Sequence, residues 1–281
     1  MIAKAEVAQP MIASHLHSLR FPAKSQNVSM VKSQAEKLDE VKSRTWFYEF
    51  DLPDGSYTST DVTADVRPIH TSRRDMLVQI IRERVESPQD LTAADFASHE
   101  GYYSIELSRH FKSVRGYEFR EESLAAARLI TDVLGVRNVE YVRADLQKME
   151  FDKSLVADFV LVYGLIYHLE NPIHAIHLAS QLCRKHILVE TQVFPYNISG
   201  MIEDGNYMNL RRVEGVFGLS PDYSHGREGG STDIALVPSL NSVLYLLKNF
   251  GFSEVSVLPS GPNDYEQFRR GSRVIVYGSK A

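Results

Sequence analysis

The segment between residues 90 and 118 places an acidic side chain where a nucleoside could be bound. An apolar run over residues 91–97 turns at residues 98–101 into an amphipathic stretch, and a second apolar run ends at Glu118. This order predicts a strand, a tight turn, a helix and a second strand with an acid at its tip. A helix N-terminus offers unpaired backbone N–H groups to a ligand, and a carboxylate about 20 residues further on accepts hydrogen bonds from both ribose hydroxyls. The segment therefore predicts a nucleoside pocket.

The turn after Asp95 has one glycine, Gly101, where a dinucleotide-binding fingerprint would place three. Glycines at these positions let the backbone approach a pyrophosphate closely, and the side chains of Ala97 and His99 would crowd that approach. A ligand without phosphate tolerates them better. S-adenosyl-L-methionine (SAM) has adenosine, a sulfonium and an amino acid, so this turn favours SAM over NAD. A glycine-poor connection in another α/β protein is the alternative.

Residues 95–104, with the sequence DFASHEGYYS, resemble motif I of the class I SAM-dependent methyltransferases, whose usual form is D-x-G-x-G-x-G-x-x-S. Glu118 matches the ribose-binding acid after the second strand, and Asp145 matches the adenine-contacting acid after the third. The resemblance covers roughly residues 72–280. It implies a seven-stranded sheet whose last two strands form an antiparallel hairpin, with SAM as the cofactor.

A further resemblance is to one subset of that family. Residues 165–169 with Asn171-Pro172 are similar to the fourth-strand motif of a subset that includes the tRNA carboxymethyltransferases acting on wobble uridine, and residues 188–191 continue the likeness. Related small-molecule methyltransferases share these motifs.

The residues expected to bind the cofactor lie in the matched motifs, at strand ends, or at the start of the helix before the first sheet strand. They are Asp95, Phe96, Ala97, Gly101, Glu118, Phe119, Asp145, Leu146, Tyr163 and Arg73. Arg73 would reach the cofactor carboxylate. Asp95 would hold the cofactor's ammonium through water or brace the turn. The alternatives are an exposed strand-capping charge for Glu118 and an Asx turn for Asp145.

His168 is the main candidate for catalysis, because methyl transfer from a sulfonium to a neutral OH or NH requires the loss of a proton. An imidazole titrates in the useful pH range. Its alternative is a structural or substrate-positioning role, since Asn171 and Pro172 also mark the N-cap and first residue of a helix. Glu190, at the end of the fifth strand, would orient an acceptor or be a buried, paired acid.

Three residues are expected to bind substrate. Tyr167 would contact the acceptor or pack under the cofactor. Tyr207 and Arg211 combine an aromatic ring with a guanidinium, which suits a flat or anionic substrate, and surface ion pairing is the alternative. We expect no metal site: His174 and His177 lie three residues apart, but no carboxylate at a suitable spacing completes a ligand set.

These residues need an alternation of strands and helices to position them, and that alternation predicts parallel strands with right-handed crossovers. The expected fold is a doubly wound, Rossmann-like α/β fold with a seven-stranded, mostly parallel sheet and a C-terminal antiparallel hairpin. The expected strands cover residues 91–97, 113–118, 139–143, 157–163, 186–191, 253–258 and 273–279. The expected helices cover residues 31–44, 72–86, 102–111, 121–134, 172–183 and 239–250.

Two segments lie outside this alternation of strands and helices. Residues 1–71 are interpreted as an N-terminal arm with an aromatic strand at residues 46–50, and Trp46 and Tyr48 would fold over the cleft or simply pack. Within the methyltransferase domain expected at residues 72–281, residues 195–236 are rich in Gly, Asn, Tyr and Arg and are interpreted as a lid.

Length and composition fit a soluble enzyme. The chain has 281 residues, a net charge of −5 and a single cysteine, Cys183. This charge gives no general attraction to phosphates, so nucleic acid is disfavoured as a partner, though not excluded. No apolar stretch approaches the ~20 residues that span a bilayer. We expect a cytoplasmic protein that does not bind membranes, and we leave a homodimer open.

Three functions fit these observations. The first is methyl transfer from SAM to an oxygen or nitrogen of a metabolite or natural product, with the arm and residues 195–236 as a lid. The second is tRNA modification, with SAM or carboxy-SAM as donor and Arg73 or Arg211 as a cationic contact. The third is a non-catalytic, nucleoside-binding domain, which the missing glycines make plausible.

Overall fold

The computed structural model describes residues 32–204, 207–222 and 232–281. The elements described here belong to the compact unit of residues 34–281. The expected arm therefore lies outside the described residues up to residue 31. From residue 34 onward, its remaining part belongs to the same compact unit as the sheet.

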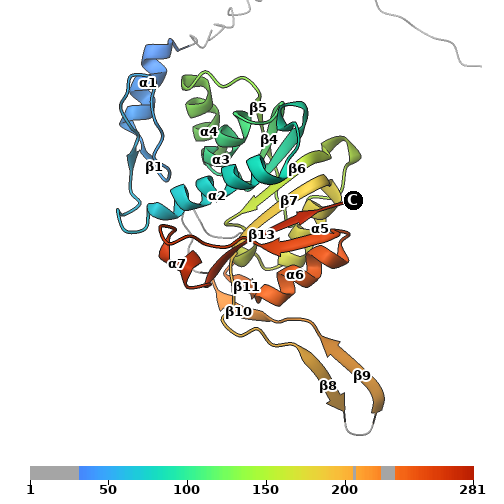
Figure 1. The fold of residues 1–281 in the computed structure, drawn as a ribbon. Helices are drawn as coiled ribbons and strands as arrows, with labels where there is room; N and C mark the ends of the chain where they lie inside the picture. Colours follow the sequence, from blue (N-terminus) through green and yellow to red (C-terminus); the bar gives the residue numbers. More distant parts are fainter. Residues whose placement is uncertain (1–31, 205–206, 223–231) are drawn as a thin grey trace, which may run out of the picture. The chain divides into compact units, whose positions relative to one another are not determined.

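A seven-stranded sheet in the order β12-β13-β7-β6-β3-β4-β5 forms the centre of this unit (Figure 1). Strands β3 to β7 are parallel, and the last two strands run antiparallel, as predicted. Every residue of β6 is buried, which fits its continuous apolar sequence and a sheet covered on both faces. The bounds are β3 Thr92–Phe96, β4 Ser113–Glu118, β5 Val139–Arg143, β6 Ala157–Tyr163, β7 Cys183–Gln192, β12 Glu254–Val257 and β13 Arg273–Ser279.

Helices cover both faces of the sheet. Phe159 and Leu161 of β6 belong to the same apolar core as residues of α2, α3 and α4, whereas Val160 and Val162 pack with α5 and α6. This alternation follows from the two-residue period of a strand. The helices are α1 Gln34–Ser43, α2 Pro68–Arg84, α3 Tyr102–Ser108, α4 Glu121–Val133, α5 Pro172–Leu182, α6 Leu240–Asn249 and α7 Glu266–Arg269, with short 3-10 turns at η1 Pro88–Asp90, η2 Lys153–Leu155 and η3 Ile166–His168.

The aromatic segment before α2 differs from the predicted strand. Only Trp46 lies in a strand, β1 (Thr45–Trp46), which pairs with β2 (Ser59–Thr60). The next two residues bend, because the backbone N–H groups of Phe47 and Tyr48 donate to the Glu100 carboxylate, at 2.8 and 3.2 Å, and not to a neighbouring strand. This segment is therefore attached to the turn that follows β3.

The expected lid forms two antiparallel hairpins where it is described. They are β8 (Gly200–Asp204) with β9 (Tyr207–Val213), and β10 (Phe217–Pro221) with β11 (Ile234–Pro238). The second hairpin is joined to the loop after β6, since the Leu236 N–H donates to the Leu169 carbonyl at 2.9 Å. Among the described residues, no helix is both long and apolar enough to cross a membrane.

Candidate functional site

The turn after β3 keeps the backbone shape of a glycine-rich loop with only one glycine. Ala97, His99 and Gly101 have φ angles of +59°, +51° and +83°. These three residues occupy the positions where the methyltransferase motif has glycines. Only Gly101 meets a steric need as well, since a Cβ there would lie 2.2 Å from the Tyr141 hydroxyl. Ala97 and His99 are therefore strained left-handed residues, and such strain concentrates at functional sites.

Glu118 is held at the tip of β4 by this turn. Its side chain is buried, and its carboxylate accepts hydrogen bonds from the N–H of His99 at 3.0 Å and of Arg120 at 2.8 Å. Burial contradicts the alternative of an exposed strand-capping charge. The left-handed turn thus points a backbone donor at the acid that the resemblance assigns to ribose.

Glu118 and Asp145 line a common cavity of about 70 Å³ at the carboxyl edge of the sheet, together with Phe119 and Leu146. Asp145 also makes the Asx-type contact considered above, because its carboxylate accepts a hydrogen bond from the Gln147 N–H at 3.0 Å. The two interpretations of Asp145 are therefore compatible. Two acids beside an apolar wall provide acceptors for ribose hydroxyls and for an exocyclic amine.

A larger cavity of about 350 Å³ adjoins the first and shares Ala97, Glu118, Arg120 and Leu165 with it. Its wall also includes the aromatic segment, the first turns of α2, the residues that follow β6, and the start of β13. Predicted site residues that line it are Arg73, Tyr163, Tyr167 and His168. The two cavities are parts of one cleft at the edge where open α/β sheets bind ligands.

Asp95, Phe96 and Gly101 support the turn and do not line either cavity. Asp95 is 1% exposed, and its carboxylate accepts a hydrogen bond from the Ser104 hydroxyl at 2.6 Å. Burial raises the pKa of Asp95 to about 7. Of the two roles expected for Asp95, this geometry matches bracing the turn against α3.

Of the two roles expected for Glu190, the structure matches the buried, paired acid. It is fully buried, with one oxygen 2.7 Å from Arg273 Nη1 and the other 2.9 Å from Arg73 Nη2 and 2.8 Å from the Gly164 N–H. Burial alone would raise the pKa of Glu190, but the two guanidiniums hold it below its ordinary value. A carboxylate with occupied oxygens and a lowered pKa does not serve as a base, so Glu190 positions the arginines.

His168 is paired with an acid that the sequence did not reveal. His168 Nδ1 lies 3.0 Å from the Asp222 carboxylate, which follows β10 and is 54 residues away in sequence. Both side chains are largely buried, and His168 lines the larger cavity. An acid on Nδ1 fixes the imidazole tautomer and orientation that a general base needs.

Arg273 is another residue of the cleft that sequence reasoning missed. The Arg273 guanidinium lies 5.0 Å from the centre of the Tyr167 ring, and its Nη1 is 3.3 Å from the Tyr167 hydroxyl. The available signal was an arginine at the start of an otherwise apolar strand. The side chains of Tyr207 and Arg211, both in β9, lie outside the described residues.

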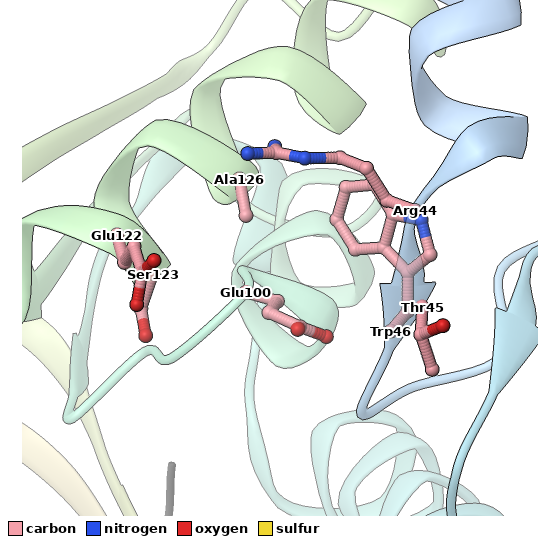
Figure 2. A pocket seen from close by; sticks show the side chains of 7 residues that line it. All are labelled: Arg44, Thr45, Trp46, Glu100, Glu122, Ser123 and Ala126. Atoms are coloured by element: carbon pink, nitrogen blue, oxygen red, sulfur yellow. The ribbon is translucent and has the colours of Figure 1, made fainter.

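A third cavity, of about 270 Å³, lies beside the turn, between β1 and α4 (Figure 2). Arg44 extends over it toward Ala126, while Glu100 lies between Trp46 and Ser123 (Figure 2). Because Glu100 already binds the backbone of the aromatic segment, this cavity belongs to the attachment of that segment to the turn.

Metal binding finds no support in the described residues, where no group of three or more His, Cys, Asp or Glu side chains is placed to hold an ion. His174 Nε2 lies 3.1 Å from the Met149 carbonyl, and His177 stacks on Phe250. Both histidines have structural contacts.

Comparison with known proteins agrees with this fold. Residues 94–186 match a family model described as a methyltransferase domain. No curated protein matches the chain. Among solved structures, the N-terminal domain of EvdMO1 with SAH bound is 19% identical, with a TM-score of 0.64, and covers 88% of this chain and 95% of its own. Magnesium protoporphyrin IX methyltransferase (ChlM) from Synechocystis PCC 6803, crystallised with SAM, is 16% identical, with a TM-score of 0.51, covering 77% and 82%.

The chain thus has the Rossmann-like fold of these neighbours, and residues 94–186 within it match the methyltransferase domain model.

Proposed function

We propose that this protein transfers a methyl group from SAM to an oxygen or nitrogen of a small-molecule acceptor. The observation that carries the proposal is the placement of buried Glu118 and half-buried Asp145 on one cavity, next to a larger cavity that contains a histidine–aspartate pair. The neighbours support it: one structure of the EvdMO1 domain was determined in the presence of SAH and D-fucose, and ChlM is named a magnesium protoporphyrin IX methyltransferase. D-fucose and magnesium protoporphyrin IX are both small molecules.

The residues present fit the cofactor. Ala97 and Glu118 line both cavities, so a ligand bound by Glu118 and Asp145 would extend past Ala97 into the larger cavity, whose wall includes Tyr163 and His168. SAM, when bound, supplies an electrophilic methyl group. Alignment of donor and acceptor can contribute several kcal/mol to the rate.

His168 accepts the proton of the acceptor, and Asp222 orients the imidazole and stabilises it once it is protonated. Asp222 comes from the segment interpreted as a lid, so that segment contributes the acid that orients the base. The lid would also exclude water from the transferred group.

Calorimetric titration with SAM and SAH tests the proposal. Glu118→Ala removes the charged acceptor of the ribose hydroxyls, which is worth about 1.5–3 kcal/mol and weakens binding by about 10- to 150-fold. Glu140→Ala is the control, since Glu140 is an exposed acid on β5, outside both cavities. Absence of SAM binding by the wild type, or equal binding by the Glu118 variant, would refute the assignment.

Transfer onto tRNA has no particular observation in its favour, and the net charge of −5 predicts weak affinity for RNA. Tight, steeply salt-dependent tRNA binding would reverse this ranking. The non-catalytic alternative predicts tight SAM binding without turnover. A cytoplasmic location and a homodimer remain predictions.

A further inference from the structure

We propose that the methyl acceptor carries a carboxylate, and that Arg73 and Arg273, held together by Glu190, bind it. This inference rests on the function proposed above and names the chemical class of its acceptor. The acceptor is then a hydroxy or amino acid, whose OH or NH faces His168 while its carboxylate faces the two arginines.

The first argument is the balance of buried charge. Arg73 and Arg273 are 5% and 4% exposed, and both pair with the single carboxylate of Glu190, which is fully buried. Glu118 and Arg120 also line the larger cavity and lie 3.7 Å apart, so they offset each other. The cluster therefore keeps one positive charge that no acid on this wall neutralises. An uncompensated buried charge is unfavourable, and an incoming anion compensates it.

The second argument is a set of buried polar atoms that lack hydrogen-bond partners among the described residues. They are Arg73 Nε, His70 Nδ1 and the Tyr163 hydroxyl, and all three residues line the same cavity. Buried polar groups in proteins are almost always satisfied, so this group of atoms indicates a ligand with polar atoms. Arg73 Nε can only donate, which requires an acceptor atom on that ligand.

His70 adds no charge of its own to the cavity. Burial, together with the nearby Arg73 guanidinium, lowers the pKa of His70 to about 3. The imidazole is therefore neutral near pH 7 and can donate one hydrogen bond to an anion. A carboxylate, with two oxygens and about four acceptor positions, suits the two guanidiniums and this imidazole together.

The topology places Arg273 at the acceptor end of the cleft. The ribose-binding acid is on β4 and the turn follows β3, whereas Arg273 begins β13 and pairs with Gln192 at the end of β7. Strands β6 and β7 separate β3 from β13, so the two edges are about 14 Å apart at about 4.8 Å per strand. The backbone of Arg273 therefore starts on the side of the sheet away from the ribose-binding acid, and its guanidinium extends to meet Arg73 at the Glu190 carboxylate.

Arg73 is closer to the cofactor end, because its Nη2 would lie 3.3 Å from a Cβ at Gly164, directly after β6. The cofactor's α-carboxylate, or the additional carboxylate of carboxy-SAM, is therefore the competing source of the anion. The experiment must separate an anion on the acceptor from an anion on the donor.

Acetate serves as the probe for a carboxylate. Wild-type protein saturated with SAH is titrated with sodium acetate against sodium chloride at equal ionic strength, at pH 7, and the Nε–H signal of the Arg73 side chain is followed by NMR. We expect a saturable shift with acetate in the SAH complex. Arg273→Met, which leaves a neutral Arg73–Glu190 pair, weakens acetate binding at least tenfold, while Arg273→Lys retains part of it.

Arg84→Met is the matched control, because Arg84 forms an exposed ion pair with Glu254 away from the cleft and should bind acetate like the wild type. Arg273→Met should change the affinity for SAH less than twofold. It should also change by less than twofold the ratio of the SAH affinity to the affinity for methylthioadenosine, which lacks the amino acid.

Three results would overturn the proposal. They are no response of the SAH complex to acetate, competition between acetate and SAH, and a preference for carboxy-SAM over SAM that Arg273→Met abolishes. The last two would assign the arginines to the donor. If the wild type does not bind SAH, the proposed function fails, whereas the acetate titration of the protein alone still reports on the anion site.

Discussion

Replacing Ala97 by glycine should stabilise this protein, although glycine usually destabilises. Ala97 has a φ of +59°, a left-handed conformation that costs an L-residue about 1–2 kcal/mol. Glycine removes that cost but makes the unfolded chain more flexible, which opposes folding by about 0.4–1 kcal/mol. The methyl group of Ala97 is half-buried at the cleft, so its removal leaves no core cavity. The expected net gain is about 0.5–1 kcal/mol, or roughly 1–3 °C in Tm.

Urea denaturation followed by circular dichroism, with and without SAH, measures this difference. Ala125→Gly is the control, because Ala125 is an exposed residue inside α4, where glycine costs about 1 kcal/mol. The two variants should therefore move the midpoint in opposite directions. If Ala97→Gly destabilises as much as Ala125→Gly, the turn does not hold Ala97 in a strained conformation, and the argument for a preformed site loses its basis.

Three further predictions concern the charged groups of the cleft. His168→Gln should lower kcat by about 10²–10⁴-fold, and Asp222→Asn should lower kcat by less. Both variants should bind SAH like the wild type. A weakened affinity for SAH would instead assign the His168–Asp222 pair to cofactor binding. Because the pKa of Asp95 is raised to about 7, the folded state binds more protons than the unfolded state between pH 4 and 7, so stability should fall as pH rises through that window, and Asp95→Asn should flatten the pH dependence in denaturant titrations. Glu190→Gln leaves two buried guanidiniums without a counter-charge and should cost about 3–5 kcal/mol of stability by urea denaturation; a loss below about 1 kcal/mol would contradict the charge balance described above.

The predicted bounds of β4, β5, β6 and β13 match the structure. The signal is clearest for β6, because its apolar run at residues 159–162 is buried on both faces of the sheet and has no competing interpretation of similar length. The aromatic segment at residues 46–50 was predicted wrongly as a strand. Its pattern is typical of one, but a carboxylate from a distant turn binds its N–H groups, and local propensity contains no information about that partner.

The hairpins between β7 and α6 show the same limit of prediction from local sequence. Short strands in a segment rich in Gly and Asn give a weak periodic signal, so the sequence predicted an insertion there without its internal structure. Asp222 could not be found in that segment, because its role depends on His168 being brought beside it by the contact between β11 and the loop after β6.

Glu190 shows why the position of an acid does not determine its role. At the tip of a strand beside a cleft, a carboxylate can be a base, a ligand or a counter-ion, and all three give the same sequence pattern. The surrounding charges decide among them: Arg273 is 83 residues away in sequence, and Arg73 comes from a helix that precedes the whole sheet. Two guanidiniums around one buried carboxylate lower its pKa, which removes its capacity to accept a proton, and leave an excess positive charge. The acid that resembles a catalytic residue in the sequence therefore makes the wall of the cleft a place for anions.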